Sequence, residues 1–481
     1  MAPPYVLVLD QGGHSSRALV FDAVGCVIAN ASEKVSTQYP AVGCVEQNPS
    51  EILQSLRDVI AAVAAQLGDR CKDIIAAALI VQRSSLVALD ETSGEPLSPI
   101  LSWQDTRHAH WLTEKSKNQL SFLRRLTGLR ANAHYGASKM RWLLDNTAVV
   151  HAAERQNRLC LAPLAGYLCR CLTEAEHTVV DAVIASRTLL TETSALQWSS
   201  TLLDFFAIPH AVLPEVRASL ADYGEIAVGD IKVPLRLLGG DQSFFMLSYG
   251  VQFDDGTVFI NAGTGAFVQQ WMPAADIPQH LLVSPLMITA DPKNTVVVAE
   301  GTVNAAATAL DWWQQQSGIV LSDEFWQKAE LTCCRYPNEV PVFVNRITAS
   351  GSPDWLPAGE SFFNAEAALP LKTMAVLEAI VFALQRNMDL LEQRKPCSTI
   401  VMSGGLSKLD IFCQRIASLS GKLVLRSDDT EACARGAAMQ LLPSATGDQQ
   451  FEQFDPVVDE NLCKRYQRWT AQMDQLSVVD G

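Results

Sequence analysis

The hydrophobic residues near the start of the chain follow a strand, loop, strand pattern. The segments YVLVLD (5–10), RALVFD (17–22) and CVIANA (26–31) are apolar runs separated by short polar or glycine-containing connections. Apolar runs of this length that are joined by such short connections are typical of neighbouring antiparallel strands. We therefore predict an antiparallel meander over residues 5–31.

Helical spacing of the apolar residues follows this meander. In residues 51–68 apolar side chains recur three and four positions apart, directly after Asn48, Pro49 and Ser50. We predict a helix with Ser50 as its N-cap and Gly68 as its end. Three further apolar runs, at residues 74–82, 85–90 and 99–103, predict strands, so the first part of the chain is expected to mix strands with a crossover helix.

The pattern of the opening hairpin returns about half a chain later. Residues 105–220 are predicted to be mainly helical, and a second α/β region begins near residue 230. The segment TVFINAGTGAFVQQW (257–271) has the same strand, glycine loop, strand form as residues 5–21, which suggests a duplicated architecture, although such units also arise by coincidence. The other elements expected in this region are strands at 233–240, 294–301 and 398–403, and helices at 302–317, 370–393 and 409–421.

Composition narrows the class of protein. The chain has 481 residues, of which 48% are hydrophobic and 19% charged, so it can bury a large core and is expected to hold two to four domains. Its net charge of −15 argues against nucleic acid or a membrane as the main partner. The twelve cysteines form no C-x-x-C pair, the N-terminus lacks a basic segment, and no apolar run approaches the ~18 residues of a membrane span. We therefore expect a cytoplasmic protein with reduced cysteines.

The first candidate site is the loop after Asp10. Glycine N–H groups approach anions closely, serine hydroxyls add donors and arginine adds charge. A carboxylate at a strand end also suits a hydrated Mg²⁺. A plain hairpin turn explains the loop equally well on its own. The residues concerned are Asp10, Gly12, Gly13, His14, Ser15 and Arg17.

Three other glycine-containing segments carry candidate chemistry. Asp241 and Gln242, in GGDQ, place a carboxylate beside an amide, which suits proton abstraction from a hydroxyl, although an Asx-type turn is the alternative. Thr264 lies between two glycines and offers donors to a phosphate, but the lysine of a P-loop is absent. Gly404 and Gly405 join a strand to a helix, which favours either a nucleotide or a packing turn.

Arginine and aromatic residues suggest a site for a polyhydroxylated ligand. Arg83, Trp103 and Tyr135 combine bidentate donors with apolar faces, which is what such a ligand requires. Taken singly, Trp103 is equally well explained as a core residue and Arg83 as a surface residue.

In their order and spacing these segments resemble the FGGY family of carbohydrate kinases, and the glycerol kinases most among them. The resemblance runs from about residue 5 to 442 and rests on LDQGGHSSRALVFD, VQRSSLVALD, LGGDQSFF, NAGTGAF and SGGLSKL. It implies an α/β protein with two ribonuclease-H-like (actin-like ATPase) domains flanking a deep catalytic cleft. The implied domains are a polyol- or sugar-binding domain at 1–230 and a nucleotide-binding domain at 231–445, followed by a tail at 446–481 without an assigned role.

The resemblance also implies a reaction: ATP-dependent phosphorylation of a hydroxyl of a small polyol or sugar, with Mg²⁺ near Asp10 and Asp241 as the general base. Arg17 and Thr264 would contact phosphates, and a homodimer is compatible with the family. The implied acceptor site is Arg83, Ser84, Trp103, Tyr135, Asp241, Gln242 and Phe267. The implied nucleotide site is Gly12, Gly13, His14, Ser15, Arg17, Gly263, Thr264, Gly265, Ala307, Gly404 and Gly405.

The chain also departs from the family pattern. Ser84 stands where the glycerol kinases have a glutamate that binds the acceptor, and Gly13 and His14 stand where the family has two threonines. Ala307 replaces a glycine, and Leu409 lies near the position of an asparagine that helps hold the base. These departures support an alternative hypothesis, a catalytically weakened homologue that acts as a sugar- or nucleotide-binding sensor. They also leave the identity of the acceptor open.

Overall fold

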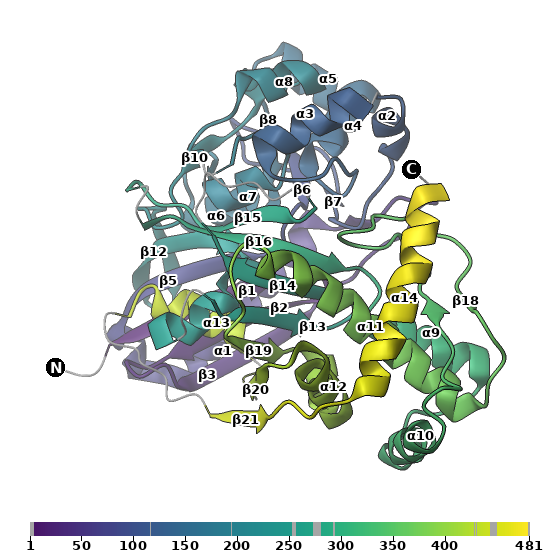
Figure 1. Ribbon diagram of the computed structural model, residues 1–481. Coiled ribbons are helices and arrows are strands. Elements are labelled where there is room, and N and C mark those ends of the chain that lie inside the picture. Colours follow the sequence, from purple (N-terminus) through teal and green to yellow (C-terminus); the bar gives the residue numbers. More distant parts are fainter. Residues whose placement is uncertain are drawn as a thin grey trace.

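Two mixed β-sheets form the framework of the protein in the computed structural model (Figure 1). The structure describes residues 4–115, 117–193, 195–252, 256–272, 280–291, 294–427, 429, 431–442 and 450–479. In the first sheet β1 pairs antiparallel with β2 and parallel with β5, and β5 pairs parallel with β12. The predicted meander is therefore confirmed. The strand order is β3 (Val27–Lys34), β2 (Ser15–Phe21), β1 (Tyr5–Gln11), β5 (Ile74–Val81), β12 (Ile231–Gly240), β11 (Glu225–Val228).

The second sheet repeats this arrangement. Its hairpin β13–β14 is antiparallel, β13 pairs parallel with β19, and β19 pairs parallel with β20. The shared order of hairpin and parallel strands confirms the duplication predicted from the two glycine loops. The strand order is β15 (Leu282–Met287), β16 (Val296–Val303), β14 (Ala266–Trp271), β13 (Val258–Ala262), β19 (Thr399–Ser403), β20 (Leu423–Ser427), β21 (Phe451–Phe454).

Helix α1 (Pro49–Leu67) packs against β2 and β3 of the first sheet with its apolar face. Its N-cap is Asn48, whose side chain accepts hydrogen bonds from the backbone N–H groups of Ser50 and Glu51, so the prediction of Ser50 as the cap is wrong. An asparagine followed by proline at the first helical position is an equally good start signal, and here it applies two residues earlier. The predicted end at Gly68 is confirmed.

An elaborate subdomain follows β5 and occupies the top of the view in Figure 1. Residues 105–220 are mostly helical, as predicted, but they also contain three short strands that the prediction missed. The helices are α2 (Ala109–Thr113), α3 (Lys117–Thr127), α4 (Gly136–Asn146), α5 (Ala148–Arg155), α6 (Leu164–Thr173), α7 (Ala182–Ser186) and α8 (Ser200–Phe206). The strands of this region are β6 (Leu86–Asp90), β7 (Ile100–Leu101) and β8 (Leu159–Pro163), which form one sheet with β4 (Glu46–Gln47) from before β5. Strand β9 (Val179–Asp181) pairs separately with β10 (Glu215–Arg217).

A thin layer of short helices joins the two sheets. It consists of the 3₁₀ helices η3 (Asp241–Phe244) and η4 (Met246–Gln252) and of α13 (Ala432–Met439), which packs on β1, β2 and β5 of the first sheet. Gly436 of α13 has no room for a side chain, because a Cβ there would overlap the carbonyl oxygen of Phe244. This close contact ties the C-terminal half of the chain to the end of β12.

Most of the remaining helices lie on the second sheet or on the long helix that covers it. That helix is α11 (Leu369–Glu392), which is mostly buried. Helix α9 begins at Ala307, later than the predicted residue 302, because residues 302 and 303 still belong to β16. The other elements are the 3₁₀ helices η1 (Gly68–Asp73), η2 (His210–Val212) and η6 (Gly405–Lys408), helices α9 (Ala307–Ser317), α10 (Asp323–Arg335), α12 (Asp410–Ser420) and α14 (Glu460–Val479), and strands β17 (Phe343–Val344) and β18 (Phe362–Phe363).

Two predicted domain limits do not match the sheets. Strand β12 lies after residue 230 but is hydrogen-bonded to β5, so the first sheet continues to Gly240. The segment after residue 446 is part of the second unit, since β21 pairs with β20 and α14, the yellow helix in Figure 1, crosses α11 and packs on it. Arg465 of α14 makes a buried bidentate ion pair with Glu378 of α11, at 2.7 and 2.8 Å.

Candidate active site

The loop between β1 and β2 begins with a buried carboxylate that is held by an arginine. Asp10 and Arg17 are cross-strand partners and form an ion pair, and Arg17 Nη1 also donates to Glu431 Oε2 at 2.7 Å. Burial raises the pKa of Asp10, and Arg17 opposes that rise. The loop is thereby tied to the segment before α13. Sequence patterns gave no sign of Glu431, which lies 414 residues from Arg17.

The tip of this loop is open to solvent on the side of His14. The Gly12 N–H donates to the Ser15 carbonyl at 2.9 Å and closes the turn. The His14 side chain is exposed and makes no hydrogen bond among the described residues. Gly13 lies on the other side of the loop, where an added Cβ would be 3.7 Å from Trp103 Nε1. The loop therefore borders a predicted acceptor residue.

Three buried glutamines hold the loop in place. Gln82 Nε2 donates to Gln11 Oε1 at 3.1 Å and to Gln47 Oε1 at 2.8 Å, and Gln47 Nε2 donates to the Gly13 carbonyl at 2.9 Å. These amides connect β1, β4 and the end of β5. None was predicted, because buried glutamines have no spacing signature.

Asp241 follows β12 directly and lies close to Arg83. An added Cβ on Gly240 would be 2.6 Å from Arg83 Cγ, so glycine is required for the arginine to lie against the strand end. The Asp241 carboxylate accepts a hydrogen bond from the Gln242 N–H at 2.7 Å. Burial raises the pKa of Asp241 to about 6, with Asp10 adding to the rise and Arg83 opposing it. A carboxyl with this pKa accepts a proton efficiently near neutral pH.

Arg187, which was not predicted, contacts Tyr135 and lies near enough to Arg83 to repel its charge. The Arg187 guanidinium lies over the Tyr135 ring at 5.1 Å, and its Nη1 donates to Ser284 Oγ at 3.2 Å. Tyr135 is only 4% exposed. Its ring thus serves mainly as packing beneath Arg187.

His134, rather than Tyr135, contacts the remaining predicted acceptor residues. His134 Nε2 lies 3.2 Å from Ser84 Oγ, and its ring packs edge-on against Trp103 with centroids 5.6 Å apart. Burial, and then the charges of Lys139, Arg187 and Arg83, lower the pKa of His134 well below 6.5, so the imidazole is neutral. A neutral imidazole either donates or accepts a hydrogen bond. Sequence analysis selected the neighbouring aromatic residue instead.

Lys139 of α4 anchors the segments that carry these residues. It is fully buried, and its Nζ donates to the carbonyls of Ser84, Ser102 and His134 at 2.8, 2.9 and 2.9 Å. Three loops that are distant in sequence therefore converge on one ammonium group. The motif around Lys139 suggested only a helix.

The predicted phosphate residues lie at the β13–β14 turn, against the start of α9. The Gly263 carbonyl accepts from the Ala307 N–H at 3.0 Å, and the Thr264 carbonyl accepts from the Ala306 N–H at 2.9 Å. The Thr264 side chain is exposed, and its hydroxyl makes no hydrogen bond among the described residues. Gly265 lies against β16, since an added Cβ would be 3.0 Å from the Val303 carbonyl oxygen. The turn thus presents a free hydroxyl beside a helix N-terminus.

The two glycines that follow β19, Gly404 and Gly405, lie next to this turn. Gly404 has a φ of +90°, and a Cβ there would overlap the Ala262 carbonyl oxygen, so only glycine fits. Gly405 is exposed with open space around its Cα, and Leu409 immediately precedes α12. A hydrogen bond of 3.1 Å from Asn261 Nδ2 to Gln242 Oε1 connects this side with Asp241.

Phe267 completes the connection, because it pairs with Asn261 in the β13–β14 ladder. The predicted residues thus form two groups. One surrounds Asp241 and Arg83, the other surrounds Thr264 and Gly404, and the bond between Gln242 and Asn261 joins them.

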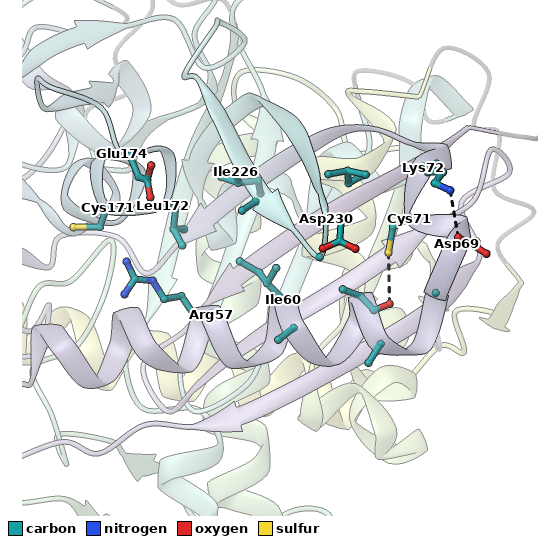
Figure 2. A pocket seen from close by; sticks show the side chains of 17 residues that line it. Arg57, Ile60, Asp69, Cys71, Lys72, Cys171, Leu172, Glu174, Ile226 and Asp230 are labelled. Carbon is teal, nitrogen blue, oxygen red and sulfur yellow. Dashed lines mark hydrogen bonds and ion pairs between the residues drawn. The ribbon is translucent and has the colours of Figure 1, made fainter.

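A cavity of about 860 Å³ lies away from these residues, between α1, η1, the end of α6 and the β11–β12 hairpin. Figure 2 shows the side chains that line it. Aliphatic residues such as Ile60 and Ile226 line it, and Arg57 and Asp230 lie among the charged residues that border them. None of the predicted site residues lines this cavity.

Buried polar atoms without hydrogen-bond partners indicate the site better than the volume of a cavity does. Among the described residues, no residue with such an atom lines the cavity of Figure 2, whereas five such atoms belong to residues around Asp241. Buried polar atoms without partners are expected where a ligand supplies the missing hydrogen bonds. We therefore take the region around Asp241 as the candidate active site. The five atoms are Gln82 Oε1, Arg83 Nη1, Arg187 Nε, Ser243 Oγ and Glu300 Oε1.

The described part of the chain contains no group of three or more histidine, cysteine or acidic side chains able to hold a metal ion. Within the same residues, no helix is both long enough and apolar enough to cross a membrane.

Comparison with known proteins agrees with this geometry. The models for the N-terminal and C-terminal domains of the FGGY family of carbohydrate kinases match residues 5–245 and 258–443. A glycerol kinase of Geobacter sp. (strain M21) is 29% identical, over 98% of this chain and 99% of its own length. Among solved structures, the glycerol kinase of Plasmodium falciparum with ADP has a TM-score of 0.86 at 20% identity, covering 99% of this chain and 98% of its own. The gluconate kinase of Lactobacillus acidophilus has a TM-score of 0.84 at 19% identity, covering 100% and 99%.

Proposed function

Because the chain belongs to the FGGY family of carbohydrate kinases, we propose that it transfers the terminal phosphoryl group of ATP to a hydroxyl of a small polyol or sugar, with Asp241 as the general base. The observation that carries the proposal is the environment of Asp241. Its carboxyl follows the end of β12 near Arg83, and burial raises its pKa to about 6. This is the protonation behaviour that a base acting at neutral pH requires.

The proposed reaction needs few groups. Asp241 takes the proton of the acceptor hydroxyl, the oxygen forms a bond to the γ-phosphorus, and the bond from that phosphorus to the β–γ bridging oxygen breaks to release ADP. Such transfers depend chiefly on positioning and on neutralisation of phosphate charge. Gln242, held by Asn261, is in place to orient the acceptor beside Asp241.

The second group supplies the phosphate contacts. The Thr264 hydroxyl, which has no hydrogen-bond partner among the described residues, can donate to a phosphate oxygen, and Arg17 of the β1–β2 hairpin adds a cation. Mg²⁺ commonly binds one or two carboxylates together with substrate phosphates, and Asp10 fits this donor set. Its raised pKa shows that Arg17 only partly compensates its buried charge. When bound there, the ion would neutralise phosphate charge.

The fold leaves the acceptor undecided. The solved relatives are named as kinases of glycerol, gluconate or xylulose, and all share this architecture. The acceptor is therefore determined by side chains such as Ser84 and His134 rather than by the framework.

The test is ADP release with Mg-ATP over a panel of glycerol, tetritols, pentitols, ketopentoses and heptuloses. We expect turnover with at least one compound, and a loss of about 10³-fold or more in kcat for Asp241→Asn. Asp230→Asn, at an exposed position beside the large cavity, is the matched control and is expected to retain wild-type activity. Asp241→Asn activity within about tenfold of wild type would refute the assignment of the base. Binding of a panel compound without any turnover would favour the sensor hypothesis.

His14 has a separate test. Its exposed imidazole lies where the family carries a threonine, and it is free to face the phosphates. If His14→Thr raises turnover at neutral pH, the histidine weakens the loop. If it abolishes turnover, the imidazole is a replacement donor.

A further inference from the structure

Buried arginines in this protein are of two kinds. Among the described residues, five arginines are at most 8% exposed when the whole residue is counted. Arg170 is paired with Glu91, and both Arg415 and Arg465 are paired with Glu378. The other two, Arg83 and Arg187, have no carboxylate of the described residues within 4 Å, and both lie near Tyr135 in the candidate active site.

The N–H groups of these two arginines are only partly used. The Arg83 side chain makes no hydrogen bond within the described chain, and its Nη1 is fully buried. Arg187 donates once, to Ser284, and its Nε is buried without a partner. A buried guanidinium that lacks acceptors is costly, so a missing acceptor is expected at this place.

The acids nearby do not supply that acceptor. Asp241 and Glu300 act on Arg83 at a distance, but burial and the repulsion from Arg187 prevail, and the pKa of Arg83 lies below its ordinary value. Arg465, which is also buried but paired with Glu378, has a raised pKa. The charge of Arg83 is thus compensated less well than that of a paired arginine.

Position 84 accounts for one missing negative charge. The family resemblance places a glutamate here, next to Arg83, whereas this chain has Ser84. The serine hydroxyl is short and lies 3.2 Å from the neutral His134. The acceptor side of the site therefore holds two buried arginines, and position 84 supplies neither of them with a carboxylate.

We propose that the acceptor is a polyhydroxy carboxylate, that is, a polyol with one terminal carboxylate, which Arg83 and Arg187 bind. The inference rests on the proposed kinase function. Guanidinium groups bind carboxylates in a planar, bidentate manner, and the partly exposed Trp103 offers a face for the carbon chain. A hydroxyl of the acceptor loses its proton to Asp241 and gains the phosphoryl group, ADP leaves, and the carboxylate is unchanged.

The test uses acceptor pairs that differ only in the carboxylate. ADP release with Mg-ATP is measured for glycerate and glycerol, erythronate and erythritol, threonate and threitol, ribonate and ribitol, and gluconate and glucitol. We expect the best carboxylate to exceed its neutral partner in kcat/KM by about 10- to 100-fold, the range for one charge-assisted contact.

Variants connect the preference to the arginines. Arg187→Gln should lower kcat/KM for the best carboxylate by about tenfold or more while changing that of its neutral partner much less. Ser84→Glu should reverse the preference toward the neutral polyols, glycerol included, because it restores a negative charge beside Arg83. Arg170→Gln is the matched control: it removes an equally buried arginine that is paired with Glu91, and the ratio between partners should not change. Thermal melting of each variant checks folding, and Ser84→Glu keeps the test decisive if Arg187→Gln fails to fold.

Each outcome has one meaning. ADP release that is greatest with neutral polyols overturns the carboxylate inference and leaves the kinase proposal intact. If no compound in either panel supports ADP release, the proposed function itself fails. A carboxylate preference that Arg187→Gln and Ser84→Glu both leave unchanged shows that other residues bind the acid, and overturns the assignment of these arginines.

Discussion

Lys139→Met should loosen the acceptor side of the site without touching its reacting groups. The ammonium of Lys139 donates to the carbonyls of Ser84, Ser102 and His134 at 2.8 to 2.9 Å, and the side chain is fully buried. Methionine has a similar length and fills the same space, so the main change is the loss of three hydrogen bonds. The carbonyls of Ser84 and His134 then lose this donor, whereas the carbonyl of Ser102 still accepts from the Asp105 N–H at 3.0 Å.

The expected magnitude follows from these contacts. Each lost hydrogen bond of this kind costs about 1–2 kcal/mol, and removal of a buried charge returns part of that sum. The lowered pKa of Lys139, about 7, shows that burial opposes the charge. A net loss of about 3 kcal/mol in the free energy of unfolding is therefore expected. For a unit of this size that corresponds to a fall in Tm of about 6–12 °C.

Melting and kinetics together test this reasoning. Melting should be followed at pH 6, where Lys139 carries all three N–H donors, and KM should be measured for acceptor and for ATP. The acceptor KM should rise more than the ATP KM, because all three carbonyls lie on the acceptor side. Lys72→Met is the control, since Lys72 is 70% exposed and its pair with Asp69 is worth under about 1 kcal/mol. If the Tm of Lys139→Met stays within about 2 °C of wild type and both KM values are unchanged, Lys139 does not organise the site.

Three further predictions address the base, the nucleotide side and the C-terminal helix. Because the pKa of Asp241 is about 6 and the base must be unprotonated, kcat/KM should fall about tenfold per pH unit below pH 6; a flat profile down to pH 5 would contradict this. Gly404→Ala should raise the KM for ATP and lower Tm, because the added Cβ would overlap the Ala262 carbonyl oxygen. Gly405→Ala is the control and should change neither quantity, because the space around Gly405 is open. Equal effects of the two substitutions would show that the overlap at Gly404 is relieved. Arg465→Met should lower the free energy of unfolding, measured with denaturant, by about 3 kcal/mol, because it breaks the buried ion pair with Glu378. A loss under about 1 kcal/mol would mean that α14 contributes little to stability.

Elements with strong local signals were predicted well. The two hairpins around Asp10 and Thr264 were identified because alternating apolar runs and glycine turns are properties of short segments. Small errors arose where two local signals compete, as at the start of α1, where Asn48 rather than Ser50 caps the helix. Larger errors arose where pairing is non-local. The membership of β12 in the first sheet depends on its hydrogen bonds to β5, and no pattern within residues 231–240 shows that partner.

The candidate site shows the same division. The carboxylate beside an amide in GGDQ suggested Asp241, and the combination of an arginine with aromatic residues suggested Arg83. The family resemblance then implied an acceptor site that contains both. The choice between Tyr135 and His134, however, depends on which of two adjacent side chains contacts Ser84, and the helix that follows them determines that direction. Arg187 and Lys139 act through contacts with loops elsewhere in the chain, so their roles have no sequence signature.

The amino-acid sequence by itself determined the chemical groups and the local elements that carry them: two glycine hairpins, an acid after β12, and an arginine followed by a serine instead of a glutamate. Only the tertiary structure decided which charges meet. Arg17 reaches Glu431 across 414 residues, while Arg83 and Arg187 lie near enough to repel each other, and neither has a carboxylate of the described residues within 4 Å. The reason is physical. Strands and turns follow from neighbouring residues, but the compensation of a buried charge depends on groups that the fold brings together from distant parts of the chain.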